Sequence, residues 1–335
     1  MVDYREAGVD VGKSDAAKKA MGESVRSTFN RDVLTEFGLF GGAVSLRGIK
    51  SMDKPVLVAS VDGVGTKLKI ARMANDYSMI GFDIVGHSVN DVLVQGARPF
   101  AFLDYLASAK LQPSVMVGIV KSMSEACRQH GIPLLGGETA QMPGVYEPGE
   151  IDVVGCIIGI VDEARMVLGR KVKEGDVLLG LPSNGLHTNG YSLARKIVFD
   201  IAGLDVMDKV EGIGPIGKAL LQPHTEYASV VLPLLEKYEI HAMSHITGGG
   251  FQGNLGRGIP KGLGVEVRLG SWPVPKLFSW LQKTGNVPQE EMYRTFNMGI
   301  GFVLIVPESA KEGIKKAAKA YEIGRIVKGQ GVRLA

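Results

Sequence analysis

The sequence contains the stretch Val56-Leu57-Val58-Ala59-Ser60-Val61-Asp62-Gly63-Val64-Gly65-Thr66-Lys67, in which an apolar run leads into a short polar segment. The apolar run is typical of a buried strand. The two glycines lack a Cβ and therefore let the backbone come close to a ligand. A carboxylate suits a metal ion, and amides with a lysine suit phosphate, so the stretch predicts binding of a nucleoside triphosphate with Mg²⁺. It is not a Walker A loop, because G-x-x-x-x-G-K-[ST] occurs nowhere in the chain.

The composition is that of an ordinary globular protein. The chain has 335 residues, 45% hydrophobic and 22% charged, and this length predicts two domains, which we place at residues 1–165 and 166–335. The formal charge of +3 and the lack of long Lys/Arg blocks argue against a nucleic-acid partner. No apolar run reaches the length of a membrane span, and the two cysteines have no metal-binding spacing. We therefore expect a cytoplasmic protein that acts on a small molecule.

Both halves of the chain alternate strand and helix signals. In the first half we expect strands at 56–61, 100–106, 132–135 and 151–161, and helices at 15–27, 80–95 and 113–130. In the second half we expect strands at 177–181, 240–246, 265–269, 300–306 and 323–327, and helices at 191–201, 226–238, 276–283 and 308–321. This order predicts an α/β fold for each half. Each half also has a strand that ends in a glycine-rich polar loop, so we expect the ligand between the halves.

One expected helix of the first half carries a polar stripe. Its members are Asp83, His87, Asn90 and Asp91, whose spacing places them on one helical face. A solvated surface is the ordinary explanation of such a stripe. However, asparagine is a poor helix-interior residue, and no Lys or Arg occurs in residues 74–97. The pattern therefore favours an acidic surface that faces a ligand.

Three glycine-containing segments follow expected strands. Gly136-Gly137-Glu138-Thr139-Ala140 can place a carboxylate at a strand end, where ligands bind in α/β sheets. The loop 183–189 offers hydroxyls, amides and His187 before a helix, which suits a sugar phosphate. Thr247-Gly248-Gly249-Gly250 offers backbone amides to an anion. The alternatives are plain turns for the first and third segments, and a helix cap by Thr188 or Asn189 for the second.

We assign no binding or catalytic role to three other patterns. Gly212–Gly217 matches G-x-G-x-x-G, but no strand signal precedes it. His241 and His245 are four residues apart, yet in an expected strand this spacing does not form a zinc pair. Ser192 has no histidine and acid that the sequence assigns to it as a triad.

Taken in order, these motifs resemble the aminoimidazole ribonucleotide synthetases, the phosphoribosylformylglycinamidine cyclo-ligase family of purine biosynthesis. The resemblance extends over nearly the whole chain, in the segments Tyr4–Asp10, Asp62–Lys67, Val89–Gly96, Gly136–Tyr146, His187–Ser192, His245–Gly250 and Met292–Gly299. The wider superfamily includes selenophosphate synthetase, thiamine-phosphate kinase and formylglycinamidine synthetase. The segments Glu138–Gly144 and Met292–Asn297 are those that favour the cyclo-ligase.

The resemblance implies ATP-dependent ring closure of formylglycinamidine ribonucleotide to aminoimidazole ribonucleotide, with release of ADP and phosphate. It implies ATP and Mg²⁺ as cofactors and a homodimer, in which the N-terminal sheets of two chains form a barrel and a C-terminal α/β domain binds substrate. A small-molecule kinase of the same superfamily is the alternative. A protein that senses nucleotide without turnover is a third possibility, but it would have lost the acids that this chain retains.

The resemblance also implies roles for individual residues. Asp62 and Asp91 hold Mg²⁺, and Lys67 contacts a phosphate of either ATP or the substrate. Asn90, Glu138 and His245 complete the catalytic set; His245 stands where related metal sites often carry an acid, so it serves phosphate binding or proton transfer. The nucleotide is assigned to Gly38, Gly41, Gly42, Gly63, Gly65, Thr66 and Asp83. The substrate is assigned to Thr139, Met142, Tyr146, Ser183, Asn184, His187, Thr188, Asn189, Ser192, Thr247, Gly248 and Gly249.

Two further expectations follow from the resemblance. The glycine-rich segment Gly38–Gly42 and a basic N-terminal helix with Lys18, Lys19 and Arg26 form a lid over ATP. The acids Asp62, Asp91 and Glu138 line one ATP site, which either a single chain or two chains of a dimer supply.

Overall fold

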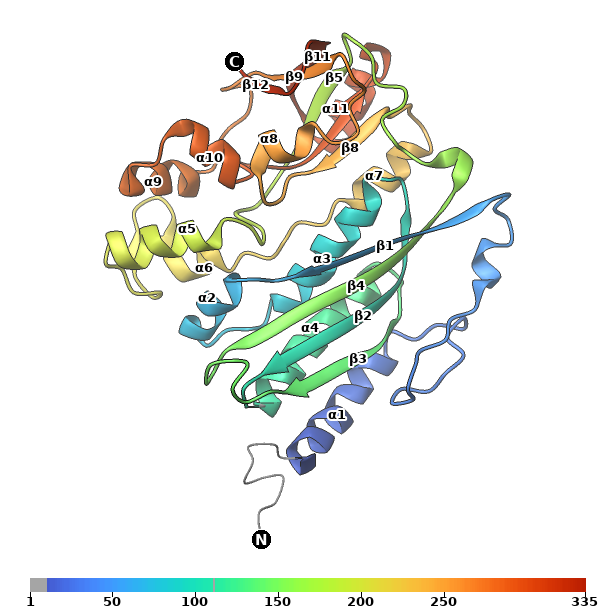
Figure 1. Ribbon diagram of the computed structural model, residues 1–335, viewed down its shortest axis with the longest axis vertical. Helices are drawn as coiled ribbons and strands as arrows, with labels where there is room; N and C mark the ends of the chain where they lie inside the picture. Colours follow the sequence, from blue (N-terminus) through green and yellow to red (C-terminus); the bar gives the residue numbers. More distant parts are fainter. Residues whose placement is uncertain (1–10, 111) are drawn as a thin grey trace. The chain divides into compact units, whose positions relative to one another are not determined.

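A computed structural model describes residues 11–110 and 112–335 of the chain, in two compact units (Figure 1). Unit 1 comprises Met1–Val92 with Ala97–Ala164, and unit 2 comprises Leu93–Gly96 with Arg165–Ala335. The segment Tyr4–Asp10 of the resemblance lies outside the described residues. Within these residues no helix is both long and apolar enough to cross a lipid bilayer.

Unit 1 is built on a four-stranded sheet with the order β1-β4-β2-β3. Its strands are β1 (Pro55–Gly63), β2 (Arg98–Ser108), β3 (Leu134–Gln141) and β4 (Ile151–Asp162). β4 pairs antiparallel with β1 and β2, whereas β2 and β3 are parallel. A parallel pair needs a crossover connection, and here the connection between β2 and β3 contains a helix.

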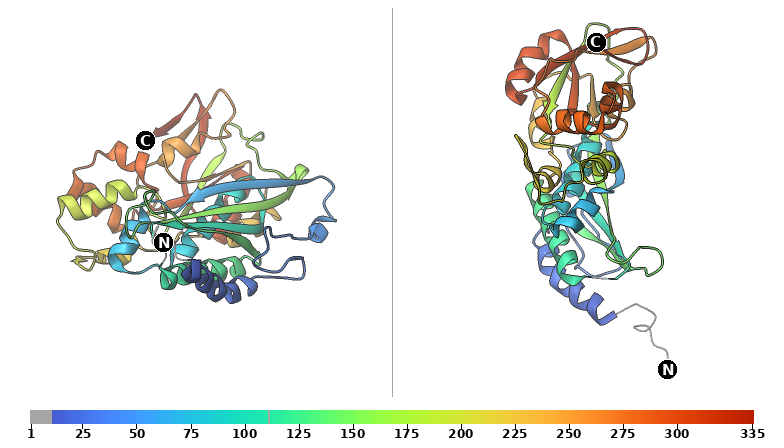
Figure 2. Two further views of the ribbon diagram at one scale, coloured as in Figure 1. Left: turned by 60° about the horizontal axis from the view of Figure 1, so that its bottom comes forward. Right: turned by 90° about the vertical axis from the view of Figure 1, so that its left-hand side faces the viewer.

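The helices of unit 1 lie on one side of this sheet (Figures 1 and 2). They are α1 (Val11–Arg26), α2 (Lys67–Ala74), α3 (Ile80–Leu93) and α4 (Pro113–Gln129), with 3₁₀ turns at η1 (Leu46–Ile49) and η2 (Glu163–Arg165). α4 begins with proline, whose missing N–H costs nothing in a first turn. α3 and α4 approach closely at Gly81, where a Cβ would lie 2.0 Å from the Met123 amide nitrogen.

The two faces of the sheet in unit 1 differ in exposure. Residues such as Val58, Phe102 and Ile157 are buried, because apolar side chains of this face pack against the helices. On the other face Leu57 and Val61 of β1 are 62% and 65% exposed. This face is apolar but open.

Unit 2 is built on a six-stranded sheet with the order β12-β9-β11-β5-β10-β8. Its strands are β5 (Val177–Pro182), β8 (Ala242–His245), β9 (Leu263–Val267), β10 (Ile300–Val306), β11 (Tyr321–Lys328) and β12 (Val332–Leu334). Neighbours are antiparallel except for β12 and β9, which are parallel. Every residue of β10 is buried, as expected for a central strand with a continuous apolar run.

The remaining elements of unit 2 are short helices and one small hairpin. They are α5 (Tyr191–Arg195), the π-helical segment η3 (Lys196–Ile201), β6 (Lys209–Val210), β7 (Gly214–Pro215), α6 (Ile216–Leu220), α7 (Ala228–Leu235), α8 (Gly250–Leu255), α9 (Lys276–Gly285), α10 (Gln289–Thr295), η4 (Glu308–Ala310) and α11 (Lys311–Ala318).

The predicted strands and helices are present, but several strands are longer than predicted, and two of the extensions include predicted site residues. β1 continues through Asp62, and β3 continues through Glu138 and Thr139, which were expected in a loop. Parallel pairing with β2 holds this part of β3, where Gly137 stands opposite Asp104. Glycine is required there, because a Cβ would lie 2.1 Å from the Asp104 carbonyl oxygen. The expected helix 308–321 is also shorter, because Lys319 after α11 takes φ +50° and β11 then begins.

Candidate functional site

The end of β1 and the face of α3 form an acidic cluster, which we define as Ser60, Asp62, His87 and Asp91. His87 Nε2 lies 2.8 Å from Asp62 Oδ2 and 3.5 Å from Asp91 Oδ2. Ser60 Oγ donates a hydrogen bond of 3.1 Å to Asp91 Oδ2. The spacing of His87 and Asp91 by one helical turn makes this arrangement possible. The structure therefore brings together the two predicted metal ligands, Asp62 and Asp91, around one imidazole.

The acidic cluster sets one histidine against two carboxylates. Burial disfavours the charged form of His87, but the hydrogen bonds and charges of Asp62 and Asp91 outweigh it and raise its pKa to about 9. Burial likewise opposes ionisation of Asp62, yet the His87 contact outweighs it and lowers the pKa of Asp62. The two carboxylates are 47% and 24% exposed. Two accessible carboxylates that converge on one position fit the oxygen-donor preference of Mg²⁺.

Lys67 and Asp83 contact each other, which differs from the separate roles predicted for them. Lys67 Nζ lies 2.7 Å from Asp83 Oδ1, and both side chains are fully buried. They join the start of α2 to the first turn of α3. Burial lowers the pKa of Lys67 and outweighs the opposing effect of Asp83. In this structure the two side chains form an internal ion pair, so neither the predicted phosphate contact of Lys67 nor the predicted nucleotide contact of Asp83 is present at an exposed surface.

Asn90 and Glu138 are not part of the acidic cluster. Asn90 is buried on α3, and Glu138 is exposed on β3. Asp62 stands opposite Gly155 of β4, and Gly155 stands opposite Asp104 of β2, next to which β3 runs. Three strand spacings amount to roughly 14 Å. That Asp62, Asp91 and Glu138 line one site stays a prediction, and within a single chain such a site would span the width of the sheet.

Apart from Asp83 on α3, the predicted nucleotide residues lie at the end of β1, in the turn after it and in one further loop of unit 1. Gly63 and Gly65 precede α2, Gly65 takes φ +68°, and Thr66 is the N-cap residue. Gly38, Gly41 and Gly42 lie in a loop closed by the bridge between Val33 and Val44. Gly42 approaches β3 so closely that a Cβ would lie 2.7 Å from Leu135 Cβ.

The predicted substrate residues of unit 1 lie at the end of β3 and in the turn after it. Thr139 is in β3, and the Met142 amide donates to the Ser108 carbonyl at the end of β2. Tyr146 Oη donates to Asp152 Oδ2 at 3.3 Å. Burial and the nearby Asp152 carboxylate raise the pKa of Tyr146 to about 12. These residues form a polar edge where β2, β3 and β4 meet.

The loop 183–190 of unit 2 is held in place by side-chain hydrogen bonds. Ser183 Oγ donates to Asn297 Oδ1 at 2.9 Å, and Asn297 Nδ2 donates to the Gly185 carbonyl at 2.9 Å. Asn184 Nδ2 donates to the Pro223 carbonyl at 2.8 Å. Ser192 follows on the exposed side of α5. Asn297 therefore fixes the conformation of the predicted substrate loop.

The Thr247–Gly250 loop lies beside loop 183–190. Asn189 Oδ1 is 3.2 Å from the position that a Cβ on Gly248 would take. Asn254 Nδ2 donates to the carbonyls of Thr247, Gly248 and Gly250, the last at 2.7 Å. Because these carbonyls turn toward Asn254, the loop is held from inside, while Gly248 and Gly249 are exposed. The structure thus joins the two predicted substrate loops within unit 2.

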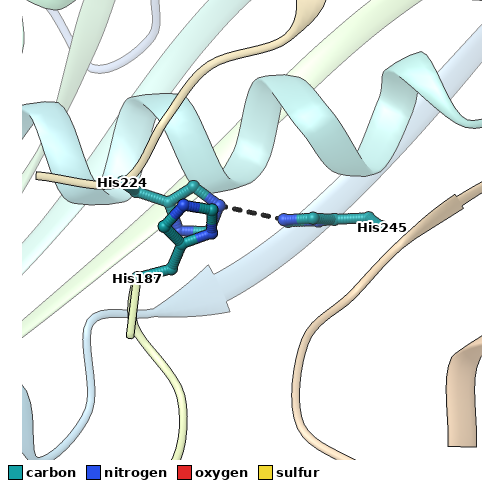
Figure 3. Close-up of side chains that lie close together, drawn as sticks. All are labelled: His187, His224 and His245. Carbon is teal, nitrogen blue, oxygen red and sulfur yellow. Dashed lines mark hydrogen bonds between the residues drawn. The ribbon is translucent and has the colours of Figure 1, made fainter. Parts of the chain in front are cut away.

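Three histidines lie at the base of these loops, and we call them the histidine cluster: His187, His224 and His245 (Figure 3). His224 Nε2 and His245 Nε2 are 2.9 Å apart. The rings of His187 and His224 are stacked with centroids 4.1 Å apart. Thr188 Oγ1 lies 3.2 Å from His224 Nδ1. All three side chains are buried.

Sequence reasoning missed His224 and Asp104. His224 lies in a loop after α6 with no periodic pattern around it, so no local signal links it to His187 or His245. Asp104 lies in an apolar strand beside Glu138; burial, reinforced by the charge of Glu138, raises its pKa to about 7. An acid within a strand was a usable signal for Asp104, because acids are depleted in strands. His241, to which the sequence assigned no role, is paired with an acid: its Nδ1 lies 2.7 Å from Asp176 Oδ2.

Comparison with protein families decides the relationship. Residues 45–161 match the N-terminal domain of AIR synthase related proteins, and residues 173–335 match the C-terminal domain. The chain belongs to the AIR synthase related family. The predicted family and the two-domain α/β fold class are thereby confirmed.

Relatives within the AIR synthase family are similar over almost their full length. The phosphoribosylformylglycinamidine cyclo-ligase of Bacillus cytotoxicus is 45% identical over 98% of this chain and 96% of its own. The enzyme of the same name from Alkaliphilus metalliredigens is 43% identical over 97% and 95%.

Solved structures of the same fold are more distant in sequence. Escherichia coli HypE has a TM-score of 0.71 at 18% identity, covering 96% of this chain and 93% of its own. Thiamine-monophosphate kinase from Stenotrophomonas maltophilia has a TM-score of 0.69 at 18% identity, covering 94% and 95%. Another hydrogenase maturation protein HypE, solved in complex with ATP, has a TM-score of 0.62 at 19% identity, covering 94% and 85%. These likenesses establish the AIR synthase-like fold and nothing further.

Proposed function

We propose that this protein is an ATP-dependent phosphoribosylformylglycinamidine cyclo-ligase, which closes the imidazole ring of aminoimidazole ribonucleotide in purine biosynthesis. The observation that carries the proposal is 45% identity over 98% of the chain to an enzyme of that name. Both groups of polar residues that the reaction needs are present, an acidic cluster in unit 1 and two adjoining polar loops in unit 2.

The reaction requires activation of a poor leaving group. A formamide oxygen does not leave by itself, so ATP phosphorylates it to an imidate phosphate. The amidine nitrogen then attacks the imidate carbon, the carbon–oxygen bond breaks, and the oxygen departs with phosphate as the ring closes. Catalysis of such a sequence rests mainly on positioning and on charge stabilisation of the phosphoryl group.

In unit 1, Asp62 and Asp91 are the proposed ligands of Mg²⁺, which when bound neutralises charge on the phosphates. The support is their shared contact to the His87 imidazolium, at 2.8 and 3.5 Å. Gly63, the exposed Gly65 and Thr66 are proposed to contact ATP. The loop with Gly38–Gly42, whose Leu39 and Phe40 side chains are exposed, is proposed as the lid.

In unit 2, the loops 183–192 and 247–249 are proposed to bind the ribose phosphate and the amidine. Their support is the close approach of Asn189 to Gly248 and the exposed glycines. His245 is proposed to contact phosphate or to accept the amidine proton. Its Nε2 lies 2.9 Å from a second imidazole, which can take up or supply a proton.

We further propose a homodimer that pairs the open faces of the sheets in unit 1. Leu57 and Val61 are exposed there, and across the antiparallel register they stand opposite Ile160 and Cys156. An exposed apolar sheet face is a common association surface. Asp62 and Glu138 lie on the two outer strands of the four-stranded sheet, and this separation also supports a site shared between two chains.

A complementation experiment tests the shared site. Inactive Asp91→Ala and Glu138→Ala proteins are mixed under conditions that exchange subunits. If each site draws these two residues from different chains, random pairing restores about a quarter of wild-type activity. No recovery, with exchange demonstrated by mass, contradicts the shared site.

Product analysis tests the function itself. The protein is incubated with ATP, Mg²⁺ and formylglycinamidine ribonucleotide, and aminoimidazole is detected by a colour reaction alongside ADP. Equal amounts of ADP and aminoimidazole support the cyclo-ligase. ADP with a stable phosphorylated product and no aminoimidazole favours the alternative, a small-molecule kinase.

A further inference from the structure

We propose that the histidine cluster of unit 2 is a binding site for a transition-metal dication such as Zn²⁺. One ligand atom from each of His187, His224 and His245 lies within 4.8 Å of the other two. The three residues come from separate segments, the loop before α5, the loop after α6 and the end of β8. The proposal concerns binding by the folded chain and does not depend on the cyclo-ligase activity.

The donor set selects the class of ion. Three imidazoles suit Zn²⁺, Co²⁺, Ni²⁺ or Cu²⁺, whereas Mg²⁺ and Ca²⁺ require oxygen ligands. Two imidazole nitrogens bound to one Zn²⁺ at about 2.0–2.1 Å are separated by roughly 3.0–3.4 Å. The observed separation of His224 Nε2 and His245 Nε2 is 2.9 Å, so only a shift of a few tenths of an ångström is needed.

Thr188 supplies the supporting contact that ligating histidines usually have. Its Oγ1 lies 3.2 Å from His224 Nδ1. A neutral imidazole carries one N–H, so when Nδ1–H donates to Thr188 the lone pair stands on Nε2, toward His245. In that tautomer His224 Nε2 can accept a hydrogen bond from His245 Nε2–H or, once that proton is released, both nitrogens can bind one cation.

The ring of His187 must move for this residue to become the third ligand. Its ring now stacks on His224 with 28° between the planes, and an ion must lie near the plane of each ligating ring. The backbone is held, because Tyr191 Oη donates to the His187 carbonyl at 3.1 Å. The side chain has room because residue 301 is glycine: a Cβ there would lie 2.4 Å from His187 Cε1. Ligation by His187 therefore requires rotation about its side-chain torsions.

Aromatic rings surround the cluster. Tyr227 lies 6.2 Å from the His187 ring and Phe302 lies 6.2 Å from the His245 ring, measured between centroids. A shell of this kind limits access of water and strengthens metal–ligand attraction. The same 2.9 Å contact is also compatible with a single shared proton, and the experiment is designed to separate these two states.

Metal-stripped full-length protein is titrated with Co²⁺, and binding is followed by visible absorption and by calorimetry. We expect saturable binding of one Co²⁺ per chain with an imidazole-ligand spectrum, displacement by Zn²⁺, and no displacement by excess Mg²⁺. His224→Asn removes one ligand and should weaken binding at least about 100-fold. Thr188→Ala removes only the supporting contact and should weaken it about 10–100-fold.

His130→Asn is the matched control, because it removes a histidine at the end of α4 in unit 1 and should bind Co²⁺ like the wild type. Circular dichroism verifies that each variant is folded; should His224→Asn fail to fold, Thr188→Ala decides, since it keeps all three rings. The proposal is overturned if the wild type binds no Co²⁺, or if the folded variants bind it with wild-type affinity. The two Nε2 atoms would then share only a proton.

Discussion

The acidic cluster of unit 1 and the histidine cluster of unit 2 arrange charge in opposite ways. In unit 1, cations meet carboxylates: His87 lies between Asp62 and Asp91, and Lys67 pairs with Asp83 inside the unit. In unit 2, the histidine cluster consists of imidazoles alone. Carboxylates suit hard cations and imidazoles suit softer ones. The comparison teaches that the donor atoms of the two clusters suit different ions, and that losing one partner should matter more in unit 1.

The largest effect should come from the buried pair. Lys67→Met leaves the Asp83 carboxylate buried without its cation, and breaking a buried pair in this way costs about 3–5 kcal/mol of unfolding free energy. Urea unfolding measures this loss. The double variant Lys67→Met/Asp83→Leu should recover much of it, because no uncompensated charge is left. Wild-type stability of Lys67→Met together with a large loss of turnover would instead support the phosphate contact first predicted for Lys67.

The buried pair also illustrates what the sequence could reveal. A lysine after Gly63-Val64-Gly65-Thr66 has the features of a phosphate-binding residue, and only the packing of α2 against α3 buries it. By contrast, His87 and Asp91 were predictable as neighbours, because one helical turn separates them. Strand cores were predictable from apolar runs, yet the extension of β3 through Glu138 was not. Hydrogen bonds from β2 hold that extension in the strand, whereas the glycines in the sequence favoured a loop.

The next effect concerns the acidic cluster. Asp91→Ala should lower kcat at least ~100-fold, since removing one charge-stabilising group commonly costs that much. Asp200→Ala, at an exposed position of η3 in unit 2, is the control and should retain normal turnover. Near-normal turnover of Asp91→Ala would remove this residue from the mechanism.

The matching change in unit 2 should cost less stability than the change at Lys67. His224→Asn removes the hydrogen bond to His245 but breaks no ion pair, and removing one partner of a buried hydrogen bond costs about 1–3 kcal/mol. The same urea measurement applies. A loss as large as that of Lys67→Met would contradict the contrast between the units. His224 was not predictable, because its partners in the cluster are distant in sequence and lie in other loops.

The last prediction is a pH dependence within unit 1. The pKa of Asp104 is raised from the ordinary 3.8 to about 7 by burial and by the charge of Glu138. Between about pH 4 and 7 the unfolded chain releases this proton while the folded chain keeps it, so stability falls as pH rises through this window. Asp104→Asn should remove that part of the slope. Unfolding free energies that change with pH identically in both proteins would contradict the raised pKa.

The central claim is ATP-driven ring closure, and the fate of one oxygen atom tests it most directly. Formylglycinamidine ribonucleotide labelled with ¹⁸O in the formyl group is converted with ATP, and the released phosphate is analysed by mass. Because ATP phosphorylates that oxygen before the ring closes, we predict aminoimidazole ribonucleotide and ¹⁸O-labelled phosphate in equal amounts. Aminoimidazole formed with unlabelled phosphate, or ADP formed without aminoimidazole, would contradict the account.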